Sequence, residues 1–288
     1  MSQRYRTIQI YLPNGDPTGI RIAELTTSII RVIEIPRNLV SQFSKTDEAN
    51  QVGFYFLFGG DNHNEVYIGQ SGNLGSRLTQ HSKNDDRDWE RALAVVSLTN
   101  NLTQTHVLYL ESISIERAKS CDRYTVINGN GGQRPHTPIP LRDDCDEIHE
   151  IASLLMATLG YPVFEPLVDD SKAEEREIFY CTRSGADAKA VYTNEGLVVL
   201  KGSRGLLNPT GKSRPDLIKA RDRLIERGVI EVQGETTVFT KDWLFSTPSG
   251  ASNAVAVMPS NGWREWKTFK GVTLDEIYRA EINQKADH

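Results

Sequence analysis

The sequence has little cysteine and no long apolar run, and each absence excludes a class of protein. Cys121, Cys145 and Cys181 are far apart and form no CxxC pair, so neither a disulfide framework nor a zinc site is expected. No apolar stretch approaches the roughly 18 residues that a membrane-spanning helix needs. The N-terminal residues turn polar too early for a signal peptide. We therefore expect a cytoplasmic protein with reduced thiols and no membrane partner.

A net positive charge is also lacking. The formal charge of -5 argues against a protein coated with basic groups for DNA binding. The acidic residues are unevenly spread, however, because residues 135–170 alone carry a net charge of -7. The remaining segments are near neutral and can present local basic patches. At 38% hydrophobic and 25% charged residues, the 288-residue chain has a globular composition and a length typical of about two domains.

Hydrophobic periodicity predicts strands interspersed with helices. Short runs that alternate apolar and polar residues, or that are apolar throughout and bounded by turn residues, predict strands. These runs cover residues 5–12, 19–26, 53–59, 65–69, 178–182, 196–203 and 236–240. Apolar residues at helical spacing predict helices over 37–49, from an N-capping Ser71 onward, and over 104–119, 146–159 and 213–230. The turns PNGD and GDNHN make the first two pairs of strands typical of hairpins.

The stretch EVYIGQSGNLGSRLTQH, residues 65–81, joins an apolar strand to a helix through a glycine-containing turn. Tyr67 lies on this strand, and Tyr55 lies on the preceding strand of the same hairpin. Arg77 and His81 are four residues apart and share one helix face. By ordinary burial preferences, the tyrosines pack at the edge of a core, and the arginine and histidine face water. The alternative is that the four side chains form part of an active site.

Glu111 interrupts an apolar stripe on the helix predicted over residues 104–119. It lies four residues after Val107 and four before Ile115, at helical spacing from both. Either the helix is apolar all round and Glu111 marks its solvent side, or a partly buried carboxylate is present because it binds a metal or another cation. The pattern alone leaves both interpretations open.

Five elements in this order resemble the GIY-YIG nuclease family over roughly residues 51–132. They are GFY at 53–55, YIG at 67–69, Arg77 eight residues beyond the YIG glycine, Glu111 in YLE, and the asparagines of NGN. Phe54 departs from the isoleucine of the family name but keeps an apolar strand position. The resemblance implies hydrolysis of DNA phosphodiester bonds at a single divalent metal ion.

The resemblance also implies a role for each side chain. Glu111 would hold the ion, Mg²⁺ or Mn²⁺, since one carboxylate together with substrate oxygens suits such hard cations. Arg77 would bind the scissile phosphate, and Tyr55 would help to deprotonate the attacking water. Tyr67 and His81 would orient groups or handle protons beside it. Because an unperturbed tyrosine has a pKa of about 10, the role of Tyr55 requires positive charge nearby.

The asparagine of the site has two candidates. Asn128 fits the loop asparagine that orders the site in the family, but Asn130 is only two residues away. Both lie in a segment rich in Asn and Gly, which is typical of a loop. The sequence does not decide between them.

Residues 201–214 form a basic segment without acidic residues. Its cations suit contact with the phosphate backbone of DNA, although a solvated surface loop is the commoner explanation. The predicted DNA contacts are Lys201, Arg204, Lys212 and Arg214.

Residues 245–267, FSTPSGASNAVAVMPSNGWREWK, resemble a small C-terminal domain of unknown function that often follows GIY-YIG nuclease domains. The NGWxxW pattern also resembles restriction-associated modules that are suspected of reading modified DNA. Alternatively, Trp263 and Trp266 are core residues, because buried aromatic side chains dominate small cores.

Together these observations predict an α+β fold. A small mixed sheet of the GIY-YIG type is flanked by helices, with an N-terminal hairpin extension and a second, smaller α+β domain. The expected segments are an N-terminal hairpin and helix extension (1–50), a nuclease-like domain (51–134), an acidic helical connector (135–177), a C-terminal domain for DNA recognition or partner binding (178–270) and a tail helix (271–288). The predicted function is a divalent-metal-dependent DNA endonuclease. The alternative is a non-catalytic nucleic-acid-binding or regulatory module that retains the nuclease fold. The sequence does not indicate an oligomeric state.

Overall fold

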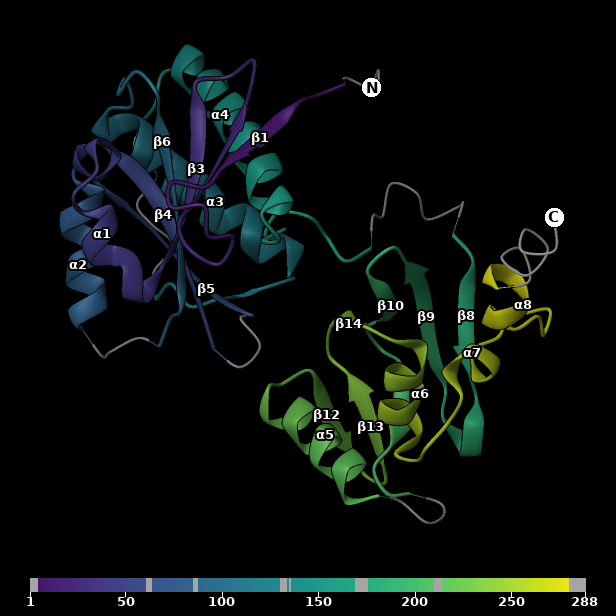
Figure 1. Ribbon diagram of the computed structural model, residues 1–288. Helices are drawn as coiled ribbons and strands as arrows, with labels where there is room; N and C mark the ends of the chain where they lie inside the picture. Colours follow the sequence, from purple (N-terminus) through teal and green to yellow (C-terminus); the bar gives the residue numbers. More distant parts are fainter. Residues whose placement is uncertain are drawn as a thin grey trace. The chain divides into compact units, whose positions relative to one another are not determined.

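The computed structural model describes residues 5–60, 64–84, 88–129, 134, 136–168, 176–209 and 214–279. The chain divides into two compact units, Met1–Glu165 and Pro166–His288. Each unit combines β-sheet with packed helices and has its own hydrophobic core (Figure 1). The α+β class expected from the sequence is therefore confirmed, including the second, smaller α+β region.

Seven strands form a single sheet in the first unit. They are β1 (Ile8–Tyr11), β2 (Arg21–Leu25), β3 (Ile30–Pro36), β4 (Gly53–Gly59), β5 (Glu65–Ser71), β6 (Arg91–Ser97) and β7 (Thr125–Val126). Their order across the sheet is β1-β2-β3-β6-β4-β5-β7. Neighbouring strands are antiparallel except β5 and β7, which run parallel, so the sheet is mixed. The apolar run GFYFLFG forms β4, which lies between two other strands and is buried along its whole length.

The N-terminal strands belong to the same sheet as the segment that resembles a nuclease. β1 and β2 form the predicted N-terminal hairpin. β3 then pairs with β6 over its whole length, from Ile30 opposite Ser97 to Pro36 opposite Arg91. The sequence patterns do not predict β3 or β6, because both are buried on two faces and lack the alternation of a half-buried strand. The predicted boundary at residue 50 therefore lies within one continuous sheet.

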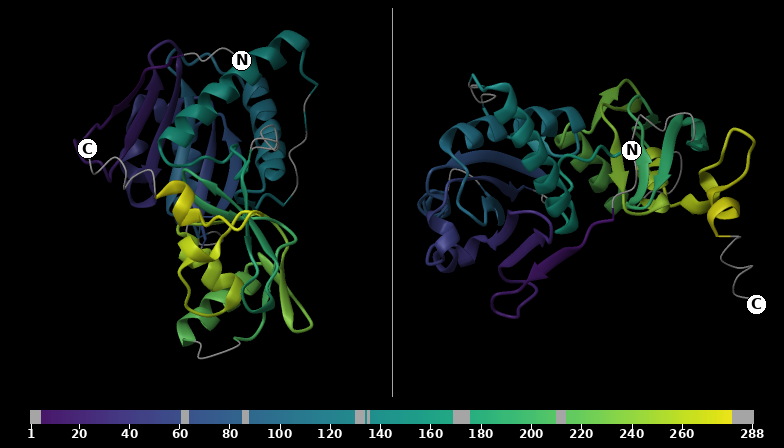
Figure 2. Two further views of the ribbon diagram at one scale, coloured as in Figure 1. Left: turned by 90° about the vertical axis from the view of Figure 1, so that its right-hand side faces the viewer. Right: turned by 90° about the horizontal axis from the view of Figure 1, so that it is seen from above.

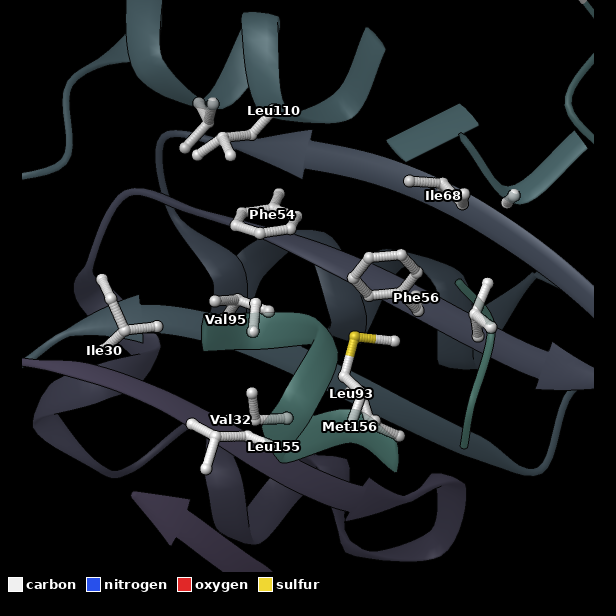
Figure 3. Packing of buried hydrophobic residues seen from close by; sticks show 14 of the residues in the cluster. Ile30, Val32, Phe54, Phe56, Ile68, Leu93, Val95, Leu110, Leu155 and Met156 are labelled. Atoms are coloured by element: carbon white, nitrogen blue, oxygen red, sulfur yellow. The ribbon is translucent and has the colours of Figure 1, made fainter. Parts of the chain in front are cut away.

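Four helices cover the two faces of this sheet. They are α1 (Val40–Phe43), α2 (Leu74–Lys83), α3 (Gln104–Cys121) and α4 (Ile139–Thr158). Figure 3 shows Phe54 of β4 beside Leu110 of α3, and Phe56 beside Met156 of α4. Tyr55 lies between these two phenylalanines in the chain and packs on the opposite face, with α1 and α2. The two-residue period of the strand therefore places Tyr55 on the α2 side of the sheet.

The start of α2 is set by an asparagine rather than by the serine that the sequence predicted. Asn73 is the N-cap, and its side chain accepts a hydrogen bond from Ser76 N at 2.8 Å. Ser71 instead ends β5, where its hydroxyl accepts a hydrogen bond from Asn73 N at 3.0 Å. The two side chains together turn the chain from the strand into the helix.

Two other predicted helices also differ in their limits. α4 begins at Ile139 rather than at residue 146, because a proline in its first turn suits a helix start. The run over residues 37–49 forms short pieces in place of one helix: the 3-10 segments Arg37–Leu39 and Asp47–Asn50 flank α1. Neither difference changes the class of the fold.

A buried histidine lies between α3 and α4. His149 Nδ1 is 2.9 Å from a terminal nitrogen of Arg117, and because a guanidinium only donates, Nδ1 accepts this hydrogen bond. The imidazole also packs on the Phe164 ring, with 4.3 Å between ring centroids. Burial, and then the charge of Arg117, lower the pKa of His149 to about 3. His149 is therefore neutral at physiological pH.

The second unit contains two smaller antiparallel sheets. Its strands are β8 (Ile178–Cys181), β9 (Ala188–Thr193), β10 (Gly196–Val199), β11 (Arg204–Leu206), β12 (Ile230–Gln233), β13 (Thr236–Phe239) and β14 (Trp243–Phe245). One sheet has the order β14-β10-β9-β8 and the other β11-β13-β12. The helices are α5 (Pro215–Glu226), α6 (Pro248–Ala256), α7 (Gly262–Glu265) and α8 (Leu274–Tyr278). α6 packs against β10 and β11 and so joins the two sheets (Figure 2).

The NGWxxW pattern holds α7 against α6. Trp266 is fully buried, as the core interpretation predicted, and its indole nitrogen donates to Pro248 O at 3.1 Å. Gly262 lies so close to the same turn that an added Cβ would approach Pro248 O to 2.1 Å. Trp263 is only half-buried and packs beside Tyr192, with 5.6 Å between ring centroids. The two tryptophans therefore have different roles, one in the core and one at its edge.

Within the described ranges, no helix is both long enough and apolar enough to cross a bilayer. Cys121, Cys145 and Cys181 are free thiols, and the last two are buried. Burial raises the pKa of Cys145 to about 12, so that this thiol is protonated at neutral pH.

Candidate active site

The hydroxyl of Tyr55 is at the centre of the candidate site. Its ring is fully buried on β4, and its oxygen accepts a hydrogen bond from Arg77 Nε at 3.1 Å. The same oxygen lies 2.8 Å from His81 Nε2. The guanidinium donates the first of these hydrogen bonds, and the tautomer of His81 sets whether Nε2 accepts the phenol proton or donates to the same oxygen. Arg77, Tyr55 and His81 therefore form one hydrogen-bonded chain.

Helix α2 presents two of these side chains from successive turns. Leu74 and Leu78 are buried and pack with Tyr55 in one apolar cluster, which fixes the helix on the sheet. Arg77 and His81 are four residues apart, so they project together from the helix toward the Tyr55 hydroxyl. Both positions lie on one helix face in the sequence, and in the structure both reach the same oxygen.

Gly69 makes room for the Tyr55 ring. It lies directly opposite Tyr55 in the pairing of β4 with β5. A Cβ at residue 69 would lie 2.5 Å from the Tyr55 hydroxyl oxygen and 2.6 Å from Cζ, closer than real Cβ atoms approach other atoms. The glycine of YIG is therefore part of the packing of Tyr55, a contact that the sequence pattern does not reveal.

Tyr67 completes an aromatic cluster with Tyr55 and His81. The ring centroids are 6.3 Å apart for the two tyrosines, 5.7 Å for Tyr67 and His81, and 5.5 Å for Tyr55 and His81. The hydrogen bond with Tyr55, and then one with Tyr67, raise the pKa of Arg77. The structure thus brings together the four side chains that the sequence singled out on two strands and a helix.

Burial dominates the acidity of Tyr55. It raises the pKa of Tyr55 to about 12, although the hydrogen bond and the charge of Arg77 both lower it. The neighbouring Tyr67 and Glu111 raise this pKa further. At neutral pH, about one molecule in 10⁵ therefore carries the phenolate. Arg77 supplies the positive charge that the sequence analysis required, but this charge does not compensate for burial.

Glu111 lies within electrostatic reach of the cluster. Burial raises the pKa of this half-buried carboxylate, and the charge of Arg77 lowers it. Its charge also acts on Tyr55. In the described part of the chain, the carboxylate accepts no hydrogen bond and forms no ion pair. Glu111 is therefore half-buried, and its charge interacts with that of Arg77.

The donor set fits a hard divalent cation bound mainly by oxygen. Among the described residues, no group of three or more His, Cys, Asp or Glu side chains is arranged to hold a metal ion. Glu111 offers carboxylate oxygens that no described donor occupies, next to the cationic Arg77. Mg²⁺ is commonly held by one or two carboxylates, with water and substrate phosphate completing its shell. Glu111 is therefore suited to such an ion.

Asn128 fixes the loop after β7 to the strand that carries Tyr67. Its side-chain oxygen accepts from Ile68 N at 3.0 Å, and its side-chain nitrogen donates to Ile68 O at 2.7 Å. The amide thereby continues the parallel pairing of β5 and β7, in which Ile127 N donates to Val66 O at 3.0 Å. The other candidate, Asn130, lies outside the described residues.

The predicted DNA contacts of the second unit do not share one loop. Lys201 lies in the turn after β10, and Arg204 is the first residue of β11. Arg214 is the N-cap of α5 and forms an ion pair with Asp216 at 3.0 Å. Lys212 lies outside the described residues. The basic segment is therefore divided among different elements.

Sequence reasoning missed the residues that hold the end of α2. The Trp89 indole nitrogen donates to His81 O at 3.4 Å. The Arg37 guanidinium lies over the Trp89 ring, 5.3 Å from its centroid, and donates to Ser82 O at 3.4 Å. Gln80 accepts a hydrogen bond from Arg77 at 2.6 Å. A tryptophan within the polar run DDRDWE is a signal for Trp89, but Arg37 and Gln80 have no such signal.

A comparison with protein families identifies part of the second unit. Residues 179–278 match the model of one protein family. This segment runs from β8 to α8. The match is to DUF4357, a domain of unknown function. Residues 179–278 of the second unit are therefore similar to the DUF4357 family, which is consistent with the C-terminal domain of unknown function that the sequence predicted. No curated protein and no solved structure matches the chain.

Proposed function

We propose that the chain is a divalent-metal-dependent DNA endonuclease that hydrolyses phosphodiester bonds. One observation carries the proposal: the Tyr55 hydroxyl is held between Arg77 Nε and His81 Nε2, within electrostatic reach of Glu111. The resemblance of residues 51–132 to the GIY-YIG nuclease family supports it, because these side chains occupy the motif positions.

Arg77 would bind the scissile phosphate. A guanidinium carries five N–H groups in a planar fork. Tyr55 accepts from Nε, and Gln80 accepts from a terminal nitrogen, so that further N–H groups remain for phosphate oxygens. Charge-assisted hydrogen bonds from such a fork both position a phosphate and stabilise the charge that develops on it.

Tyr55 and His81 would carry the proton away from the attacking water. Because the pKa of Tyr55 is about 12, Tyr55 is a neutral phenol, not a phenolate, before the reaction begins. Instead, a water that donates to the Tyr55 oxygen passes a proton to it as the phenol proton moves to His81 Nε2. The relay uses the tautomer of His81 in which Nε2 accepts, the 2.8 Å contact between Nε2 and the Tyr55 oxygen supports it, and Tyr67 packs against both rings.

Glu111 would hold Mg²⁺ or Mn²⁺. When bound, the ion supplies charge neutralisation at the phosphate and at the leaving oxygen. Asn128 would keep β5, and with it Tyr67, in place through its two hydrogen bonds to Ile68. A cytoplasmic location remains an expectation from the sequence.

Nicking of supercoiled plasmid tests the proposal. The purified chain is incubated with Mg²⁺, Mn²⁺ or EDTA beside Glu111→Gln and Arg77→Ala. The matched controls are Glu116→Gln, an exposed carboxylate on the same α3 helix, and Lys83→Ala, an exposed cation on α2. We expect nicking that depends on metal, a loss of about 10²-fold or more in the two site variants, and parental rates in the controls. Equal nicking by Glu111→Gln and the parent would show that the metal assignment is wrong.

A non-catalytic nucleic-acid-binding or regulatory module is the alternative. The raised pKa of Tyr55 favours it, because the phenol is protonated at neutral pH and no base is already formed. Salt-dependent DNA binding without strand breaks on plain, methylated or branched DNA, in any of the metals, would support this alternative.

A further inference from the structure

We infer that the DUF4357 domain binds the phosphodiester backbone of DNA at a basic junction formed by Lys201, Lys241 and Arg227 around Trp243. This inference deepens the proposed function and relies on its DNA substrate. Of these residues, only Lys201 belongs to the basic segment, residues 201–214, that the sequence singled out. The others are brought next to it when the domain folds.

Two cationic side chains from separate elements lie beside one indole, and the backbone of Lys201 adjoins them. The Arg227 guanidinium, at the C-cap of α5, lies 5.0 Å from the centroid of the Trp243 ring. The Lys241 ammonium, in the turn between β13 and β14, lies 5.8 Å from the same centroid. A helix C-terminus favours one nearby cation, but it does not account for lysines from two other turns.

Lys201 is joined to this group through the backbone. Its N–H donates to the Asp242 carboxylate at 2.8 Å, and Asp242 stands between Lys241 and Trp243 in the chain. Asp242 is thereby engaged with the backbone. In the part of the chain that the structure describes, neither the Lys201 nor the Lys241 ammonium forms an ion pair.

Backbone hydrogen bonds make the junction rigid. Gly202 N donates to Phe239 O at 2.8 Å, which ties the turn of Lys201 to the end of β13. Thr240 N donates to Val229 O at 2.9 Å, and its hydroxyl donates to Gly228 O at 2.6 Å. The turn that carries Lys241 is therefore fixed both to the Lys201 turn and to the loop that follows Arg227.

The chemistry of this junction matches a polynucleotide backbone. The ammonium groups of Lys201 and Lys241, neither of which forms an ion pair in the described part of the chain, supply local positive charge on a chain whose total charge is -5. Bringing like charges together is unfavourable unless an anion shares the site, and phosphate groups along a strand supply regularly spaced anions. The half-buried Trp243 ring also offers the kind of aromatic surface on which unpaired bases stack.

Salt-dependent DNA binding tests this inference. The full-length Glu111→Gln protein in EDTA is titrated with a labelled duplex and with a single strand at several salt concentrations. Lys201→Gln combined with Lys241→Gln removes two lysine charges of the junction. The control combines Lys189→Gln with Lys219→Gln, two exposed lysines elsewhere in the domain. Val199 pairs with Ala190 on one side and with Trp243 on the other, so these three side chains lie on the same face of the sheet. The side chain of Lys189, one residue before Ala190, therefore lies on the face opposite to Trp243.

The junction variant should bind DNA more weakly than the parent. The slope of log K, the association constant, against log salt concentration should become less steep by about 1.8 for duplex or about 1.4 for single strand. The control should retain the parental slope. A loss of single-strand affinity of about fivefold or more in Trp243→Leu, without an equal loss for duplex, would assign base stacking to the indole. Junction and control variants with equal slopes on both DNAs would overturn the inference.

Two further outcomes separate this inference from the proposed function. Metal-dependent nicking by the parent protein, together with unchanged DNA affinity in the junction variant, would refute the junction alone. Junction-dependent binding, together with no nicking by the parent protein in any metal, would refute the hydrolase and leave the junction standing. Polyglutamate carries charge but no phosphodiester and should compete poorly; competition equal to that of DNA would overturn the assignment to a phosphate backbone.

Discussion

Gly69→Ala is the sharpest test of the site geometry. The added Cβ would lie 2.5 Å from the Tyr55 hydroxyl oxygen, about 0.9 Å short of the 3.4 Å at which ordinary contact begins. Gly69 is not among the glycines with positive φ, so its backbone suits alanine. In a strand, such a replacement is ordinarily favourable by about 0.5–1 kcal/mol. A loss of stability must therefore come from the contact with Tyr55.

The Tyr55 ring has little freedom to move away. It is fully buried, and Arg77 and His81 both bind its hydroxyl. We expect overpacking to lower the free energy of unfolding by about 1–3 kcal/mol. A shift of about 1 Å in a catalytic group can reduce the rate of the chemical step by about 10²-fold. Urea unfolding and plasmid nicking measure the two effects.

Gly72→Ala is the matched control for Gly69→Ala. Gly72 directly follows the same strand, is exposed, and its added Cβ would come no nearer than 3.8 Å to Gln104. The cost of Gly69→Ala should also shrink in a Tyr55→Leu background, where the ring is absent. Parental stability and parental nicking in Gly69→Ala would refute the argument, as would an equal loss in both glycine variants.

Three further predictions concern titration and the β5 edge. Burial raises the pKa of Tyr55 from about 10 to about 12 in the folded state, so the folded state keeps the phenol proton to a higher pH than the unfolded state does. The free energy of unfolding should therefore fall as the pH rises from about 10 to about 12. Urea unfolding of Tyr55→Phe should show a smaller fall over the same pH range. Burial and Arg117 lower the pKa of His149 to about 3, so the unfolded state binds the proton first as pH falls below about 6.5. The free energy of unfolding should drop by about 2 kcal/mol between pH 7 and pH 5 in the parent and change less in His149→Asn. Asn128→Ala removes both hydrogen bonds to Ile68 and should lower the free energy of unfolding by about 1–2 kcal/mol. Hydrogen exchange at the Ile68 amide should become faster, and an unchanged exchange rate would contradict this role of Asn128.

Local patterns predicted the elements whose neighbours in space are also neighbours in sequence. The hairpins β1-β2 and β4-β5 follow from short apolar runs joined by turn residues. The helix that carries Glu111 follows from its periodicity, although the pattern could not tell whether the carboxylate faces solvent or the site. The interaction of Glu111 with the charge of Arg77, which comes from another helix, is also beyond what the pattern shows.

The rest of the site depends on pairings that the sequence does not encode locally. GFYFLFG is apolar throughout, so its pattern does not show which face of the sheet Tyr55 occupies. The contact of Tyr55 with Gly69 requires the strand register. The pKa of Tyr55 requires the burial produced by the whole sheet and α2, and the grouping of Lys201 with Lys241 requires three turns to meet.

The pairing of β3 with β6 has a consequence for how this chain can be recombined with others. A cut at residue 50 would leave β6 paired with β4 but without β3 on its other side, and would uncover apolar side chains there, so the seven strands must be inherited together. The division between the two compact units, after Glu165, leaves every strand pairing intact on either side. The N-terminal strands are therefore expected to be inherited together with β4 and β5, which carry Tyr55 and Tyr67, whereas the strands of the second unit form sheets of their own.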